Sequence, residues 1–216
     1  MMHDIGELLL ALLRYNVGMT VAAIAIALPI ACIFAFARLS PSPLIHYPTT
    51  FYVNVLRSMP LVMLIFWVYT VGPLITGQPS SAYFSALAAL AAFEVAYFTE
   101  IIRSGIQSVS TGQWNAGLAS GLSRSQTMRM IILPQALRRM TPSLLTQSLI
   151  AFQDSTIASI ISVPDILHEA TVLNAREQTP IFLYSALAII YFIVCYALSA
   201  LVRRLEHHAQ MRMSTA

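Results

Sequence analysis

The sequence contains no lysine, and only 10% of its 216 residues are charged. An ordinary soluble domain carries roughly 25% charged residues, so the chain lacks the ionic surface of a water-soluble protein. The absence of lysine also excludes a Gly-x-x-x-x-Gly-Lys phosphate loop, because that loop places its lysine on the phosphates of a nucleotide. Any ATP hydrolysis that drives this chain must therefore take place on another protein.

Cysteine and clustered metal ligands are also scarce. Cys32 and Cys195, the two cysteines, fall inside apolar runs, where cysteine packs as a small hydrophobic residue. His168 stands beside Glu169, but no second histidine follows at helical spacing, so we predict no metal site. The 12 arginines are scattered between apolar runs, which argues against a nucleic-acid-binding face.

Long hydrophobic runs dominate the sequence, and hydrophobic residues make up 57% of it. A helix needs about 20 apolar residues to cross the hydrocarbon core of a bilayer. We predict a single-domain, all-α integral membrane protein over residues 1–216, with about five transmembrane helices at residues 17–36, 58–76, 82–102, 143–163 and 180–201. Residues 44–56 are only half apolar, and we expect them to lie along the membrane interface.

The arginines are distributed unevenly between the two sides of this arrangement. Because cytoplasmic segments are enriched in arginine and lysine, the richer side is expected to be cytoplasmic. Five spans place Arg14 and Arg176 on one side. They place on the other side Arg38, Arg57, Arg103, Arg124, Arg129, Arg138, Arg139, Arg203, Arg204 and Arg212. We therefore expect the N-terminus outside and the C-terminus in the cytoplasm.

The segment at about 104–140 is the longest polar stretch and lies on the predicted cytoplasmic side. A short helix is expected to end at Gly121, which can adopt the left-handed conformation after a helix. Ser123 and Gln126 match a capping box that starts a second helix, which Pro134 is expected to interrupt. Two short helices at a glycine corner suit insertion into a groove on a soluble partner. The alternative is an ordinary loop between helices.

Three motifs of this sequence resemble motifs of the polar amino-acid permeases of binding-protein-dependent ABC importers, and they occur in the same order along the chain as in that family. The cytoplasmic signature is similar at Gly112–Ala116, Gly121 and Leu133–Ala136, although Trp114 and Asn115 stand where the family has Glu and Ala. Arg57–Leu61 resembles the family's Arg-Gly-Thr-Pro-Leu, and Ala96–Gly105 resembles its Ala-Tyr-x-x-Glu-x-x-Arg-x-Gly. The resemblance covers roughly residues 14 to 206.

The resemblance implies a type I ABC importer permease fold with a cytoplasmic coupling-helix loop, in a bacterial inner membrane. It implies ATPase-coupling residues at Gly112, Gln113, Ala116, Gly121 and Pro134. The implied partners are an ATPase dimer that binds ATP and Mg, a second permease subunit, an extracytoplasmic amino-acid-binding protein and membrane lipid. The chain itself is then no enzyme and binds no cofactor. The runs at residues 52–63 and 152–154 look closest to glutamate/aspartate permease subunits.

Several polar residues fall within or beside the predicted spans, where an ionised side chain costs at least ~2.5 kcal/mol at mid-depth. Glu94 is expected either on the substrate path or in a buried interhelical hydrogen bond, whereas Glu100 and Arg103 are expected to form a structural ion pair. Further candidates for the substrate path are a polar break in the fourth span and an arginine: Gln153, Asp154, Ser155, Thr156 and Arg57. The hydroxyls of this break also have an alternative role, bonding to their own helix.

A second function remains open from the residues alone. An ion-gradient-driven carrier or channel would use Glu94 and Asp154 as proton or cation sites. The sequence lacks the internal repeats typical of many such carriers, which favours the importer. A membrane enzyme is disfavoured because no nucleophile, base and orienting group occur at usable spacing.

Overall fold

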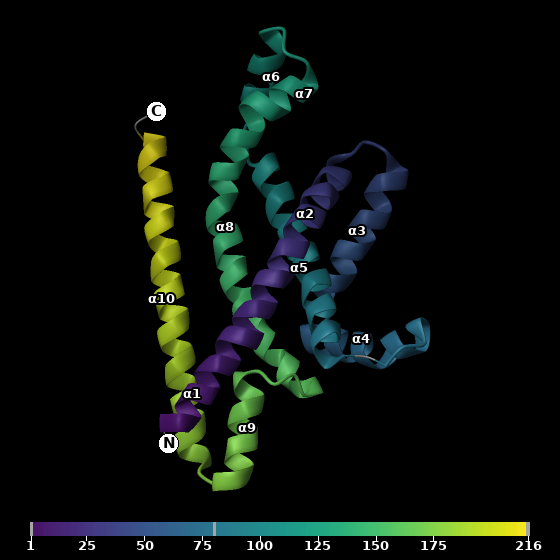
Figure 1. Ribbon diagram of the computed structural model, residues 1–216. Helices are drawn as coiled ribbons and strands as arrows, with labels where there is room; N and C mark the ends of the chain where they lie inside the picture. The colour runs from purple at the N-terminus through teal and green to yellow at the C-terminus, as the bar shows by residue number, and fades with distance from the viewer. Residues whose placement is uncertain (1, 80, 215–216) are drawn as a thin grey trace.

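The computed structural model describes residues 2–79 and 81–214, with side chains for residues 6–79, 81–200 and 202–204, and every regular element in this part is helical (Figure 1). Two short π-helices (η1 and η2) and one 3-10 helix (η3) interrupt the α-helices. In chain order the elements are α1 (Met2–Ala11), η1 (Leu12–Val17), α2 (Gly18–Leu39), α3 (Pro43–Ser58), α4 (Leu61–Thr76), α5 (Ala82–Gln107), α6 (Thr111–Ala119), α7 (Arg124–Thr127), η2 (Met128–Ile132), α8 (Leu133–Asp154), η3 (Ser155–Ile161), α9 (Ile166–Glu177) and α10 (Pro180–Ser214).

Within the described chain, three helices are long and apolar enough to cross a membrane: Gly6–Leu39, Ala82–Gln107 and Pro180–Arg204. Two bent pairs of helices raise the number to five if each pair is one span. This agrees with the expected all-α membrane fold of about five spans. The first span begins well before residue 17, because α1, η1 and α2 form one continuous helix.

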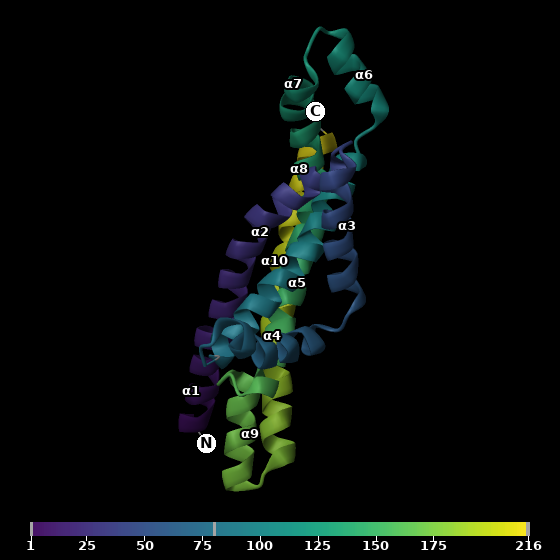
Figure 2. The same cartoon turned by 90° about the vertical axis from the view of Figure 1, so that its right-hand side faces the viewer.

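Residues 43–76 differ from the expectation. They form a bent pair in which α3 and α4 meet at 108°. The helix α3 does not lie along an interface: it runs beside α2 and α5 (Figures 1 and 2), and the Tyr52 hydroxyl donates to the Ala92 carbonyl at 2.9 Å. The expected start of the second span at Ser58 is therefore wrong: Ser58 ends α3, and the bent pair covers residues 43–76 if it is one span. Pro60, which has no backbone N–H, caps α4 in an extended conformation and marks the bend.

The helix α5 forms the centre of the molecule and contacts α2, α3, α4 and α8. Its closest neighbour is α2, which presents a stripe of fully buried alanines at every fourth residue: Ala23, Ala27, Ala31 and Ala35. Small side chains let helix backbones approach closely, which is the usual basis of helix packing inside membranes. Gly105 does the same on the α8 side, since a Cβ there would lie 2.8 Å from the Met140 Cβ.

The segment from Arg124 to Ile161 forms a single continuous helix that includes α7, η2, α8 and η3. Pro134 was expected to interrupt it, and this expectation is wrong. The proline stands at the start of α8, directly after the π-helical turn η2. A π-bulge changes the local hydrogen-bond register, so the missing proline N–H is accommodated without ending the helix.

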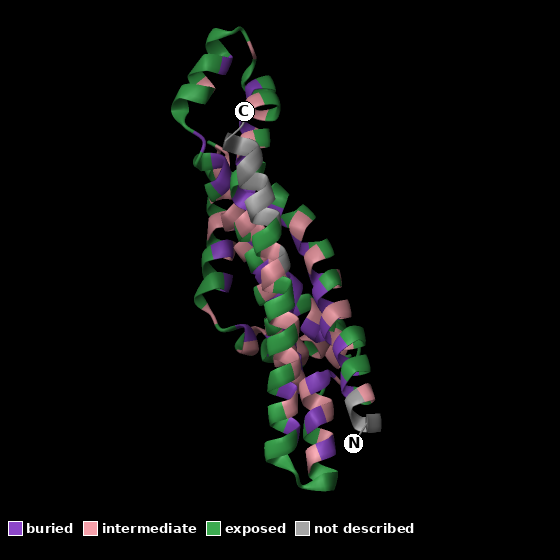
Figure 3. Cartoon of the chain, turned by 90° about the vertical axis from the view of Figure 1, so that its left-hand side faces the viewer, coloured by how far each residue is buried: buried purple, intermediate pink, exposed green. Residues whose placement is uncertain are grey.

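The molecule is elongated, with different elements at its two ends. One end holds α6, α7, the α2–α3 turn and the C-terminal part of α10, while α1, α4 and α9 lie toward the other end (Figure 1). The helices α6 and α7 project beyond the other helices (Figure 2). Exposed residues cover this projection and much of α10 (Figure 3). We call residues 111–132, from α6 to η2, the cytoplasmic knob, after the side of the membrane on which the arginine distribution predicts it.

Candidate functional site

The cytoplasmic knob has the local structure that its sequence predicts. The corner after α6 is made by Gly121 at φ +84°, a left-handed conformation that glycine adopts at little cost. The next helix opens with a complete capping box: the Ser123 hydroxyl accepts from the Gln126 N–H at 3.3 Å, and the Gln126 side chain accepts from the Ser123 N–H at 2.8 Å. Both expectations are confirmed.

A second glycine, Gly117, holds the two halves of the cytoplasmic knob together. A Cβ at this position would lie 2.6 Å from Thr127 Cγ2 and 3.0 Å from Ile131 Cδ1. The helix α6 therefore packs against η2 at a distance that only glycine permits. Sequence reasoning missed Gly117, although its position four residues before Gly121 places it one turn from the corner.

The expected coupling residues are distributed around this packing contact. Gln113 accepts a hydrogen bond from the Gln135 amide at 3.1 Å, which links α6 to the start of α8. Gly112 and Ala116 lie on the exposed surface of α6, and Pro134 is exposed at the start of α8. The surface between them is partly apolar, because Leu118 is 40% exposed and Met130 is 65% exposed.

At the other end of the same continuous helix, the polar break begins where the sequence places it. The α-helix ends at Asp154 and continues as the 3-10 helix η3 from Ser155. Gln153 is exposed and Asp154 is half-buried, whereas Ser155 is buried and donates to the Phe152 carbonyl at 2.7 Å. The Thr156 hydroxyl is hydrogen-bonded to the Tyr191 hydroxyl of α10.

A groove of ≈ 600 Å³ opens between this break and α10. Its polar groups come from Gln153, Thr156, Tyr184 and Tyr191. The apolar part is lined by Leu167, Leu187, Ala188 and Phe192, among others. An exposed amide and three hydroxyls beside apolar walls can bind a small polar molecule, since ligand sites combine apolar walls with a few convergent polar groups.

Asn16 is the polar residue that sequence reasoning missed at this end of the molecule. It is fully buried in the π-helical turn η1. Its amide nitrogen donates to Ser155 Oγ at 3.1 Å and to Asp165 Oδ2 at 3.4 Å, and its amide oxygen accepts from the Ile166 N–H at 3.2 Å. One side chain thus joins the first span, the 3-10 break and the start of α9.

Glu94 does not open onto the groove. It is 0% exposed, and the Gln147 amide nitrogen lies 3.2 Å from each of its carboxyl oxygens. This is the interhelical hydrogen bond that was one of the two alternatives, and it joins α5 to α8. Asp154 is an electrostatic neighbour of Glu94. A role for Glu94 on the substrate path stays a prediction.

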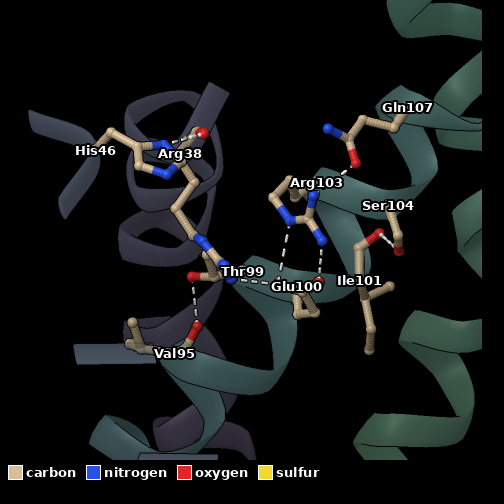
Figure 4. A network of polar contacts seen from close by, with 9 residues as sticks. All are labelled: Arg38, His46, Val95, Thr99, Glu100, Ile101, Arg103, Ser104 and Gln107. Carbon is tan, nitrogen blue, oxygen red and sulfur yellow. Dashed lines mark hydrogen bonds and ion pairs between the residues drawn. The ribbon is translucent and has the colours of Figure 1, made fainter. Parts of the chain in front are cut away.

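Glu100 and Arg103 form the expected ion pair, which the structure extends by a second arginine from α2 (Figure 4). The Arg38 guanidinium donates to Glu100 Oε2, and the Arg38 carbonyl contacts His46 Nδ1 at 2.8 Å. This cluster joins α2, α3 and α5. Sequence reasoning assigned Arg38 only to topology.

Arg57 lies beside Tyr97 and within electrostatic reach of Glu100, and its expected place on the substrate path stays a prediction. Its guanidinium carbon lies 5.3 Å from the centre of the Tyr97 ring, and its charge acts on Glu100. It stands in the last turn of α3, at the far end of that helix from the α2–α3 turn. The structure therefore does not support its place among the cytoplasmic arginines, and the remaining nine of that set still outnumber Arg14 and Arg176.

A comparison with protein families matches residues 27–210 to the binding-protein-dependent transport system inner membrane component. The chain belongs to this family. It is a non-catalytic, membrane-spanning permease subunit, and in this family ATP is hydrolysed by a partner ATPase. The family works together with ATPase and binding-protein partners.

Among curated proteins, this permease is 38% identical over 194 residues to the glutamate/aspartate import permease protein GltK of Escherichia coli, with 87% of each chain covered. It is 38% identical over 174 residues to a probable glutamine ABC transporter permease protein, GlnP, of Bacillus subtilis, with 78% of each covered. It is 30% identical over 212 residues to the arginine ABC transporter permease protein ArtQ of Haemophilus influenzae, with 95% of each covered.

Solved structures give the same result for the fold. An amino acid ABC transporter crystallised with histidines superposes with a TM-score of 0.86 at 28% identity, covering 95% of this permease and 93% of that chain. The inward-facing MetNI methionine ABC transporter superposes with a TM-score of 0.71 at 16% identity and supports the fold alone. The resemblance to amino-acid ABC importer permeases and the expected importer permease fold are confirmed.

Proposed function

We propose that this permease forms half of the translocation path of an importer for glutamate and aspartate. A second permease subunit, identical or homologous, supplies the other half, because about five spans are few to enclose a path. The N-terminus then lies outside and the C-terminus in the cytoplasm of a bacterial inner membrane. The assignment of glutamate and aspartate as substrates is supported by the 38% identity to the glutamate/aspartate permease and by the run at residues 152–154. A probable glutamine permease has the same 38% identity over a shorter stretch of 174 residues.

One observation carries the mechanism. The continuous helix from Arg124 to Ile161 holds the cytoplasmic knob at one end and the polar break at the other. A movement of the knob is therefore transmitted to Gln153, Asp154 and Thr156 through one rigid element, without any intervening loop. Coupling between distant sites requires such an element with two positions that both sites bias.

In this mechanism the cytoplasmic knob docks in a groove of the ATPase. Its exposed apolar residues, Leu118 and Met130, would be buried by the ATPase, while Arg124 and Arg129 would remain at the rim of the contact. Gly112, Gln113 and Ala116 form the docking face of α6. Gly121 sets the angle between the two halves, and Pro134 sits where the knob joins α8.

The substrate path follows the polar break. Gln153 and Asp154 are the exposed and half-buried polar groups of the fourth span, and lipid-facing positions at this depth do not carry such groups. Gln153 can donate to a substrate carboxylate, and Asp154 can accept from its ammonium group. Buried Glu94 and Ser155 hold the break in position, and Arg57 stabilises Glu100 from α3.

The test is uptake of labelled glutamate by vesicles that contain the permease with its ATPase, permease partner and binding protein, with ATP present or withheld. Strict ATP dependence with competition by aspartate, but not by histidine or arginine, is the expected result. ATP-dependent uptake of another amino acid, such as glutamine, would keep the mechanism and overturn the substrate. Uptake without ATP would restore the ion-gradient carrier, which family membership disfavours.

A further inference from the structure

A second groove lies beside α10, nearer the C-terminal end of that helix than the groove at the polar break. It has a volume of ≈ 350 Å³ and is lined by residues of the first span, of α8 and of α10: Val17, Thr20, Val21, Leu145, Ser148, Leu149, Phe152, Val194, Leu198 and Val202. The helices α8 and α10 stand beside each other along this groove (Figure 1). The membrane window of α10 is only 11% buried, so the groove lies at the outer surface of the described chain.

The groove offers no free hydrogen-bond donor to an occupant. Its two hydroxyl residues are both bonded to their own helices: Thr20 donates to the Asn16 carbonyl at 2.7 Å, and Ser148 donates to the Leu144 carbonyl at 2.8 Å. All other lining side chains are hydrocarbon. In this respect it differs from the groove at Gln153, which is lined by an amide and by threonine and tyrosine hydroxyls. The fitting ligand is therefore a hydrocarbon chain.

The groove, at ≈ 350 Å³, has the volume of a small-ligand site, about 300–1,000 Å³, and this volume suits one flexible acyl chain.

The cationic side chain of Arg138 lies beyond one end of the groove, on the face of α8 that lines the groove. Arg138 precedes Leu145 by seven residues, which is two helical turns or about 10 Å along the axis. It is exposed, and it has no hydrogen bond or ion pair within the described residues. Its neighbour Arg139, by contrast, donates to the Ser108 carbonyl. Arg138 lies toward the cytoplasmic knob, where anionic lipid headgroups are attracted to basic side chains.

We propose that this groove is a binding site for an anionic phospholipid of the cytoplasmic leaflet. One acyl chain lies between α8 and α10, and the headgroup phosphate accepts hydrogen bonds from Arg138. The lipid then contacts the same helix that joins the cytoplasmic knob to the polar break. The orientation of the site rests on the proposed topology, whereas the groove and its arginine do not.

The experiment uses vesicles that contain the assembled transporter and a trace of phosphatidylglycerol with a photoreactive acyl chain. Cross-linked peptides are mapped by mass spectrometry. Phosphatidylglycerol is expected to label residues 145–152 and 194–202 about five-fold more than phosphatidylcholine with the same acyl chain. Arg138→Ala should remove this preference, and the matched variant Arg129→Ala should keep it.

Filling the groove provides a second, independent variant. Leu198→Trp places a large side chain in the groove from the exposed helix α10 and should abolish labelling of both segments. Ile193→Trp adds the same ring to α10 outside both grooves and should leave the labelling unchanged. Equal labelling by both lipids, uniform labelling along α10, or cross-links from this groove to the permease partner would each overturn the proposal. The readout is independent of transport, so it separates this site from the proposed function.

Discussion

Two glycines of the cytoplasmic knob differ in the free space that surrounds them. Gly112 and Gly117 are both helical glycines of α6, five residues apart. A Cβ at Gly112 would meet only the Ser110 hydroxyl, at 3.9 Å, whereas one at Gly117 would overlap Thr127. The same substitution is therefore expected to have opposite effects at the two positions.

Gly117→Ala should destabilise the permease by about 1–3 kcal/mol through overpacking against Thr127, and lower the Tm by about 2–12 °C. Gly112→Ala should leave the Tm unchanged or raise it slightly, because alanine favours a helix by up to ~1 kcal/mol over glycine. Thermal unfolding of the purified transporter measures both. Equal Tm values for the two variants would show that α6 does not pack closely on η2.

Sequence reasoning at this scale was most successful where a residue acts through its own backbone. The left-handed Gly121 and the capping box at Ser123 follow from local chemistry. Asn16 and Gly117 could not be found in this way. Their roles depend on partners far along the chain or across a helix pair, as with Asn16 and Asp165. A lone asparagine at the start of an apolar run carries no signal of its own.

Among the elements, the corner between α6 and α7 is set by a single backbone conformation. Gly121 has space around it, since a Cβ at this position would have no atom within 4 Å, but its φ of +84° disfavours most side chains. Any effect of substitution there reports the angle of the corner and not a steric clash.

Gly121→Val should reduce ATP-dependent uptake on the order of ten-fold, because a left-handed conformation costs a residue with a Cβ roughly 1–2 kcal/mol and the corner is expected to change shape. Gly121→Asn should retain most of the uptake, because asparagine is tolerated in this conformation. Membrane insertion of both variants is the control. Similar loss in both variants would indicate that the glycine is needed for a contact with the ATPase and not for the corner.

The spans could be predicted where one apolar run makes one helix, as in 82–102 and 180–201, which lie within α5 and α10. The region at 43–76 could not be predicted in the same way. The apolar run in this region predicts α4. The position of α3 depends instead on its packing against other helices, including the Tyr52 hydrogen bond to Ala92. The half-polar composition of α3 fits a helix whose one face is covered by α2 and α5.

For the molecule as a whole, we predict that the end with the knob and the end with α9 lie on opposite sides of the membrane. In a background of Cys32→Ala and Cys195→Ala, Gly112→Cys should react with a membrane-impermeant thiol reagent only after inside-out vesicles are prepared. Arg176→Cys, near the end of α9, should react in intact cells. Both positions are exposed in the permease alone, so the measurement uses membranes without the ATPase, whose docking would cover Gly112. The reverse pattern would place the cytoplasmic knob outside and contradict the proposed orientation.

The continuous helix from Arg124 to Ile161 also acts as a lever. Its 38 residues span about 57 Å at the helical rise of 1.5 Å per residue. If the knob end pivots by about 5°, the far end moves sideways by roughly 5 Å. A small rotation imposed on the knob is therefore enough to shift the side chains of the polar break by more than the reach of a hydrogen bond.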